Sequence, residues 1–101
     1  MLPESDLKLL ELHKLQKLLQ ENNISFGIEK LYTGEQIKIP SIEAWNDEKD
    51  PKRISIICCS GSYGYEEGLV EMWAPSVFTD PVGYLSANSA LALIRKVNED
   101  D

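Results

Sequence analysis

The sequence is poor in the residues that usually carry enzyme or metal chemistry. It contains two cysteines and one histidine. Cys58 and Cys59 are adjacent, and neighbouring strand residues point to opposite faces, so the pair can neither form a disulfide without distorting the backbone nor share one metal. The Cys-x-x-Cys spacing of redox motifs is missing. His13 falls on the polar side of a predicted helix, where we expect a solvated surface histidine. We therefore expect a non-enzymatic protein with no catalytic residue, no metal site and no cofactor.

Long hydrophobic runs are also missing. No stretch approaches the roughly 20 apolar residues that a transmembrane helix needs. The N-terminus reads LPESDLK, in place of the basic region and apolar run of an export signal. The sequence thus predicts a cytoplasmic protein without membrane association.

Positive charge is scarce and unevenly placed. Lys and Arg number 10 against 17 Asp and Glu, which gives a formal net charge of -7. No Lys or Arg lies between Ile54 and Ile94, and the acidic residues of that span are Glu66, Glu67, Glu71 and Asp80. Nucleic acids and anionic membranes attract positive charge, so neither is expected as a direct partner. The expected partner is a protein with a basic surface.

The hydrophobic pattern predicts an α+β fold in one domain over residues 1–101, with residues 1–4 and 99–101 frayed. An N-terminal helix, an antiparallel sheet of three to four strands in two hairpins, and a C-terminal helix packed on the sheet are expected in that order. Arg53–Trp73 should form the central hairpin, because apolar runs flank a Gly-Ser-Tyr-Gly turn.

Both predicted helices have an apolar stripe and recognisable ends. The first begins near Pro3 and ends at Asn22–Asn23, because Asn tolerates the left-handed conformation that ends many helices. Leu9 and Leu10 fall outside its stripe, which consists of Leu7, Leu12, Leu15, Leu18 and Leu19. The second begins at Ser86, a good N-cap residue. Its apolar face consists of Ala87, Ala90, Leu91, Leu93, Ile94 and Val97.

The first hairpin is predicted from alternation. Residues 24–32 alternate as in a half-buried strand, and Thr33–Gly34 is expected to form a two-residue turn. The alternation places Phe26, Ile28 and Tyr32 on one face of the first strand, and the register of the turn adds Ile37 and Ile39 to that face. Pro40 cannot donate to a sheet, so the second strand either ends there or runs along a sheet edge. Residues 46–52 and 74–83 are interpreted as loops.

The loop of the central hairpin contains the residues that burial explains least. Gly61, Gly64 and Gly68 lie between strands and beside glutamates, which disfavours a phosphate-binding loop. A four-residue loop with a bulge or close packing at Gly68 is the simpler interpretation. Tyr63 and Tyr65 either pack the turn only or combine with the nearby carboxylates as a recognition surface. The predicted partner-binding residues are Tyr63, Tyr65, Glu66, Glu67 and Glu71.

Three of those residues also raise the question of acid–base chemistry. If Glu66, Glu67 and Glu71 lie on a strand, only Glu67 and Glu71 share a face, two pleats apart. We interpret these carboxylates as a solvated strand face.

Glycine-punctuated motifs recur along much of the chain. They are GEQIKIP at Gly34–Pro40, GSYG at Gly61–Gly64, EGL at Glu67–Leu69, and GYL at Gly83–Leu85 before an Ala-rich helix. Over roughly residues 24–97, this set resembles small uncharacterised proteins carried by phages and mobile elements of Gram-positive bacteria. The resemblance implies a mobile-element setting in the cytoplasm of a bacterial host, and it transfers no catalytic residue.

Three functional hypotheses follow. The leading one is a non-enzymatic, acidic protein-binding module, in its most concrete version an anti-CRISPR-like inhibitor of a host nucleic-acid-handling defence enzyme. The second is a structural or assembly subunit that forms a homodimer or larger homo-oligomer through an exposed strand edge. The third is a small-molecule-binding protein with its site at the Gly61–Gly64 loop.

Overall fold

A computed structural model describes residues 9–40, 53–74 and 80–99, with the side chains of the last helix described as far as Val97. The predictions of a helix start near Pro3, a loop at 46–52 and frayed ends at 1–4, 100 and 101 fall outside these ranges, whereas Glu99, also predicted to fray, is the last residue of the C-terminal helix. The elements in chain order are α2 (Leu10–Glu21), β1 (Gly27–Lys30), β2 (Glu35–Ile39), β3 (Ile54–Cys58), a 3₁₀ helix (Tyr65–Glu67), β4 (Val70–Trp73), β5 (Val82–Leu85) and α4 (Ala87–Glu99).

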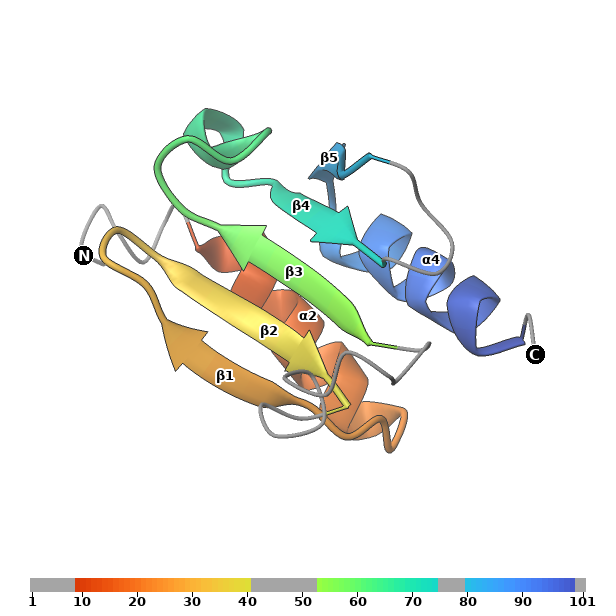
Figure 1. The fold of residues 1–101 in the computed structure, drawn as a ribbon. Coiled ribbons are helices and arrows are strands. Elements are labelled where there is room, and N and C mark those ends of the chain that lie inside the picture. The colour runs from red at the N-terminus through yellow and green to blue at the C-terminus, as the bar shows by residue number, and fades with distance from the viewer. Residues whose placement is uncertain (1–8, 41–52, 75–79, 100–101) are drawn as a thin grey trace.

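The strands form one antiparallel sheet in the order β1-β2-β3-β4-β5 (Figure 1). The α+β class is confirmed, and β3 is the central strand as expected. The prediction of three to four strands is wrong, because the sheet has a fifth strand, β5, whose first two residues fall at the end of the segment 74–83 that was interpreted as a loop. This strand pairs irregularly with β4, because the register shifts between Val70 and Met72. Its Tyr84 has a φ of 58°, outside the range of a regular strand.

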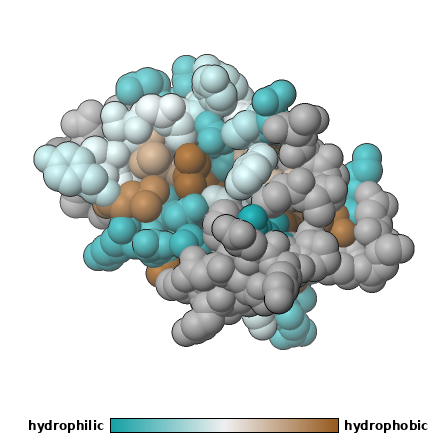
Figure 2. Space-filling model, in the orientation of Figure 1, coloured by the Kyte–Doolittle hydropathy of each residue, from teal (hydrophilic) through white to brown (hydrophobic). Residues whose placement is uncertain are grey.

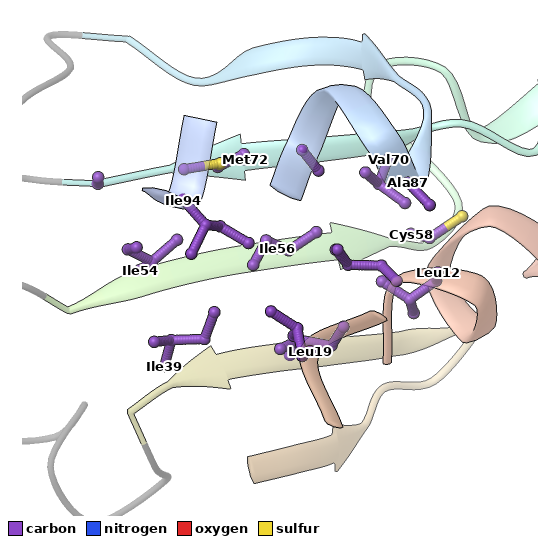
Figure 3. Close-up of a cluster of buried hydrophobic side chains, with 14 of the residues drawn as sticks. Leu12, Leu19, Ile39, Ile54, Ile56, Cys58, Val70, Met72, Ala87 and Ile94 are labelled. Atoms are coloured by element: carbon purple, nitrogen blue, oxygen red, sulfur yellow. The ribbon is translucent and has the colours of Figure 1, made fainter. Parts of the chain in front are cut away.

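Both helices cover the same face of the sheet, so the domain has two layers (Figure 1). Alternate residues of the three central strands point to the helices, namely Ile37, Ile39, Ile54, Ile56, Cys58, Val70, Met72 and Ala74. Figure 3 shows them meeting the helix side chains, with Ile94 of α4 over the central strands and Leu19 of α2 beside Ile39. Burial of these apolar side chains is the main stabilising contribution.

The two helices run side by side in the same direction (Figure 1). At their beginnings, the Ala87 N–H of α4 donates to Oε1 of Glu11 in α2, at 3.0 Å. At their ends, the Arg95 guanidinium of α4 donates to Oδ1 of Asn22. Parallel helix dipoles repel, and a carboxylate at the N-termini with a guanidinium at the C-termini offsets this repulsion.

The predicted end of the first helix is confirmed. Asn23 has a φ of 58°, and the N–H groups of Asn23 and Ile24 donate to the carbonyl oxygens of Gln20 and Leu19. This is the Schellman arrangement. Leu9, expected outside the apolar stripe, is instead buried in the core, whereas Leu10 is exposed.

The first hairpin turns one residue earlier than predicted. The Leu31 N–H donates to the Gly34 carbonyl oxygen at 2.8 Å, and Lys30 pairs with Glu35, so Tyr32 and Thr33 form the turn. Gly34 is needed for a close approach, since a Cβ there would lie 1.9 Å from the carbonyl oxygen of Cys58. When the turn moves by one residue, each residue of β1 pairs with a β2 residue two positions away from the predicted partner. A shift of two keeps every side chain on its face, so Ile28 still shares the face of Ile37.

The opposite face of the sheet carries polar pairs. Gln36 Nε2 donates to Ser55 Oγ at 2.6 Å, and Lys38 Nζ lies 2.7 Å from Glu29 Oε2. Figure 2 shows this face, where apolar surface is interspersed with polar side chains over the end of β3 and the start of β2. Among the helices that the structure describes, none has the length and apolar character needed to cross a membrane.

Candidate functional site: a tyrosine-bearing end of the sheet

The predicted partner-binding residues lie on the β3–β4 connection and the start of β4. Tyr65, Glu66 and Glu67 form a 3₁₀ helix, so the interpretation of Glu66 and Glu67 as part of a strand face is wrong. The connection runs from Cys59 to Leu69, and it is longer than the predicted four-residue loop. Gly64 (φ 100°) and Gly68 (φ 74°) flank the 3₁₀ helix in left-handed conformations that favour glycine. Gly68 is therefore a helix cap, where a bulge or close packing was expected.

Tyr63 is fixed through its backbone to both neighbouring strands. Its N–H donates to Glu71 Oε1 of β4 at 2.9 Å, and its carbonyl oxygen accepts from the Tyr84 N–H of β5 at 3.2 Å. A Cβ on Gly83 would lie 2.2 Å from the Tyr63 Cβ, so the two backbones pack tightly. The Tyr63 residue nevertheless keeps 59% of its surface exposed. The strands hold its backbone while its side chain faces solvent.

Tyr65 joins the loop to the rest of the molecule. It is half-buried against the hydrophobic core, and its hydroxyl lies 3.5 Å from the carbonyl oxygen of Thr33 in the β1–β2 turn. The Ser60 N–H donates to Thr33 Oγ1 at 2.8 Å, which is a second link between the two loops. Tyr65 thus anchors the loop more than it presents a surface.

The structure adds two tyrosines that the sequence analysis missed. Tyr32 is fully exposed in the β1–β2 turn next to Thr33, and Tyr84 is 62% exposed beside Tyr63. The segments that contain the four tyrosines of the chain, namely the β1–β2 turn, the β3–β4 connection and β5, reach the end of the sheet where β3 runs into its loop (Figure 1). We call this region, formed by Tyr32, Tyr63, Tyr65 and Tyr84 with Glu66 and Glu67, the tyrosine end.

A sequence signal for the missed pair exists. Each of the four tyrosines lies within two positions of a glycine, namely Gly34, Gly64 or Gly83. Glycine marks turns and close approaches of the backbone, where a neighbouring side chain is often exposed. Only strand order, however, brings the β1–β2 turn, the β3–β4 connection and β5 to one end of the sheet.

The carboxylates of the loop have separate roles. Glu66 and Glu67 are exposed, whereas Glu71 is half-buried and accepts the Tyr63 N–H. Glu71, predicted to contact a partner, is placed to position the loop. Lys30, at the end of β1, is exposed and lies two positions before Tyr32, so it places a positive charge near the tyrosine end in the sequence.

The thiols of the last residue of β3, Cys58, and of the first residue of this loop, Cys59, are held neutral. Burial, and then the neighbouring Cys59, raise the pKa of Cys58 to about 11. Burial and Glu71 raise the pKa of Cys59, and a hydrogen bond with Ser62 opposes them. A thiol is nucleophilic as the thiolate, so neither cysteine is activated at neutral pH.

The single histidine has a partner. His13, expected to be a solvated surface histidine, is partly exposed and also linked to β2, because its Nε2 lies 2.8 Å from Glu35 Oε1. Within the described ranges, no three His, Cys, Asp or Glu side chains come together as a metal site would require.

Comparison with known proteins gave no match. No family model fits the chain, no curated protein matches its sequence, and no solved structure matches its fold. The functional proposal therefore depends on the residues of the tyrosine end.

Proposed function

We propose that this protein is a non-enzymatic protein-binding module that contacts a partner's basic surface with its tyrosine end. The observation that supports this most is the gathering of all four tyrosines at one end of the sheet, three of them with well-exposed side chains. A fold needs few of its tyrosines in solvent, and exposed aromatic clusters are typical of interfaces.

Charge supports the choice of partner. Glu66 and Glu67 lie in the same loop as Tyr63, and the span from Ile54 to Ile94 contains no Lys or Arg. Charge complementarity accelerates association and selects partners. The same charge disfavours direct contact with nucleic acid or an anionic membrane.

The most concrete version is an inhibitor of a host defence nuclease, of the phage or mobile-element type, acting in the bacterial cytoplasm. RNA-guided nucleases hold their nucleic acid in a positively charged channel. A small acidic protein with exposed aromatic rings suits such a channel by charge and by its capacity for rigid apolar contact.

Assembly through a strand edge is the weaker alternative. The sheet has two edge strands, β1 and β5, of four residues each; in β1, Glu29 and Lys30 are charged and exposed, and β5 contains Tyr84 at a positive φ. Short, charged edges resist pairing with another chain. Sedimentation of the purified protein alone tests this alternative, which requires a stable homo-oligomer.

The proposed function is tested by co-purification with a panel of purified RNA-guided nucleases. The test variant carries Tyr32→Ser, Tyr63→Ser and Glu67→Gln, which leave the anchors Tyr65 and Glu71 intact. A matched control carries Ile28→Thr and Glu21→Gln at exposed positions outside the tyrosine end. Wild type and control should be captured, and the test variant at least about tenfold less. Equal capture of both variants would contradict the proposed surface, and no capture of wild type would remove the nuclease version.

A further inference from the structure

We propose that the tyrosine end recognises arginine side chains of its partner in preference to lysine, and therefore fits an arginine-rich segment. This inference rests on the proposed function and names the chemical group that the surface reads.

Three tyrosine rings of the tyrosine end are exposed. Tyr32 in the β1–β2 turn, Tyr63 in the β3–β4 connection and Tyr84 in β5 are all exposed to solvent. A guanidinium group is planar and weakly hydrated, so it stacks on a tyrosine face with little loss of solvation. An ammonium group is compact and strongly hydrated, so it gains less from the same ring.

Two carboxylates lie in the same loop as Tyr63. Glu66 and Glu67 are exposed on the 3₁₀ helix that directly follows Tyr63 and Gly64. A guanidinium that stacks on a ring can still donate to a carboxylate at the edge of its plane, because its five N–H groups point outward. Rings and carboxylates in the same loop thus offer both contacts to one arginine.

Hydrogen bonds fix the backbone of the β3–β4 connection in the protein without a partner. Its backbone is tied to β4 through Glu71, to β5 through Tyr84 and to the β1–β2 turn through Thr33. A surface fixed in advance loses little conformational entropy on binding. The difference in stacking free energy between arginine and lysine is therefore not reduced by the cost of ordering the loop.

The test is isothermal titration of the full chain with two peptides of equal length and charge, one alternating Arg and Gly and the other Lys and Gly. Two to three exposed stacking contacts predict about tenfold tighter binding of the arginine peptide at the same salt concentration. Equal binding of both peptides would overturn the arginine preference and leave the proposed function standing. Binding of neither would contradict both.

Variants of the exposed tyrosines test whether their rings cause the preference for arginine over lysine. Tyr32→Leu with Tyr63→Leu keeps apolar bulk and removes two ring faces, so the arginine-to-lysine ratio should fall to about two or less. Tyr84→Asn, which suits the positive φ at that position, provides a second variant should the first unfold, and it should lower the ratio by about half. Glu21→Gln, at an exposed site on α2 away from the tyrosine end, should leave the ratio unchanged. An unchanged ratio in both tyrosine variants would overturn the proposal.

Discussion

At the scale of single residues, the structure separates anchors from presented groups at the tyrosine end. Tyr65 and Glu71 were predicted as contacts, but one packs on the core and the other holds the Tyr63 N–H. Tyr32 and Tyr84 were not predicted and are well exposed. The sequence could identify the loop of the central hairpin as unusual, because burial did not explain its two tyrosines. It could not assign each residue a direction, because direction depends on contacts with β5 and the β1–β2 turn.

The backbone contact between Gly83 and Tyr63 gives a prediction. Gly83→Ala would place a Cβ 2.2 Å from the Tyr63 Cβ, so the loop must move away from β5. We expect the free energy of unfolding to fall by about 1–3 kcal/mol, as for overpacking, with weaker partner binding. Urea unfolding measures the loss. Ser60→Ala is the control, because the described bond of Ser60 to Thr33 uses its backbone, and it should stay within about 0.5 kcal/mol of wild type. A neutral Gly83→Ala would contradict the close approach.

The buried thiol of Cys58 predicts a pH dependence. Its pKa rises from an ordinary value of 9.0 to about 11, so the folded state keeps the proton longer than the unfolded state does. The contribution to stability is complete below pH 9.0 and is lost as the pH rises toward 11. The loss between these limits is about 3 kcal/mol at most. Urea unfolding at several pH values should show a steeper decline in wild type than in Cys58→Ala. Parallel declines would show that Cys58 ionises as readily in the folded protein.

At the scale of elements, local signals predicted some elements and not others. The end of α2 at Asn22–Asn23 and the start of α4 at Ser86 were predicted by capping chemistry, and the Ser89 N–H does donate to Ser86 Oγ at 3.2 Å. Strand β5 was missed because Pro81 and Gly83 resemble a turn, and its pairing with β4 is irregular. The 3₁₀ helix was missed because three residues carry no periodicity.

The pairing of the helix N-termini gives a prediction for α4. Glu11 accepts the Ala87 N–H from a neighbouring helix, which is a capping interaction supplied by tertiary structure. Glu11→Ala removes it and should cost about 1 kcal/mol of unfolding free energy, as for loss of an N-cap. The lower urea midpoint would be accompanied by faster hydrogen exchange at the first turn of α4. Glu21→Ala, exposed at the other end of the same helix, is the control, and an equal loss in both variants would rule out a specific role for Glu11.

At the scale of the whole molecule, the α+β class followed from the sequence, but the arrangement of layers did not. Apolar stripes on two helices and alternation in the strands require two layers, yet they do not say whether the helices share one face. The structure places both on the same face, with Ile56 at the centre of the core (Figure 3). The placement of Tyr32, Tyr63 and Tyr84 toward one end of the sheet is likewise a consequence of strand order and had no local signal.

Core position predicts different costs for two substitutions. Ile56→Ala, at a fully buried site, should lower the free energy of unfolding by about 2–5 kcal/mol. Leu91 is only half-buried at the edge of the core, so Leu91→Ala should cost less than Ile56→Ala. Urea midpoints for the pair check this order, and the reverse order would contradict the packing of α4 on the sheet.

The central claim is that a cationic protein partner binds at the tyrosine end. The most direct measurement is a backbone amide chemical-shift titration of the labelled protein with the Arg-Gly peptide. The predicted result is that the largest shifts fall at Tyr32–Thr33, along the loop from Ser60 to Glu67, and at Tyr84, with little change at Glu21 and the end of α2. Shifts concentrated at the α2 end, or spread evenly over the acidic residues of the chain, would contradict the account.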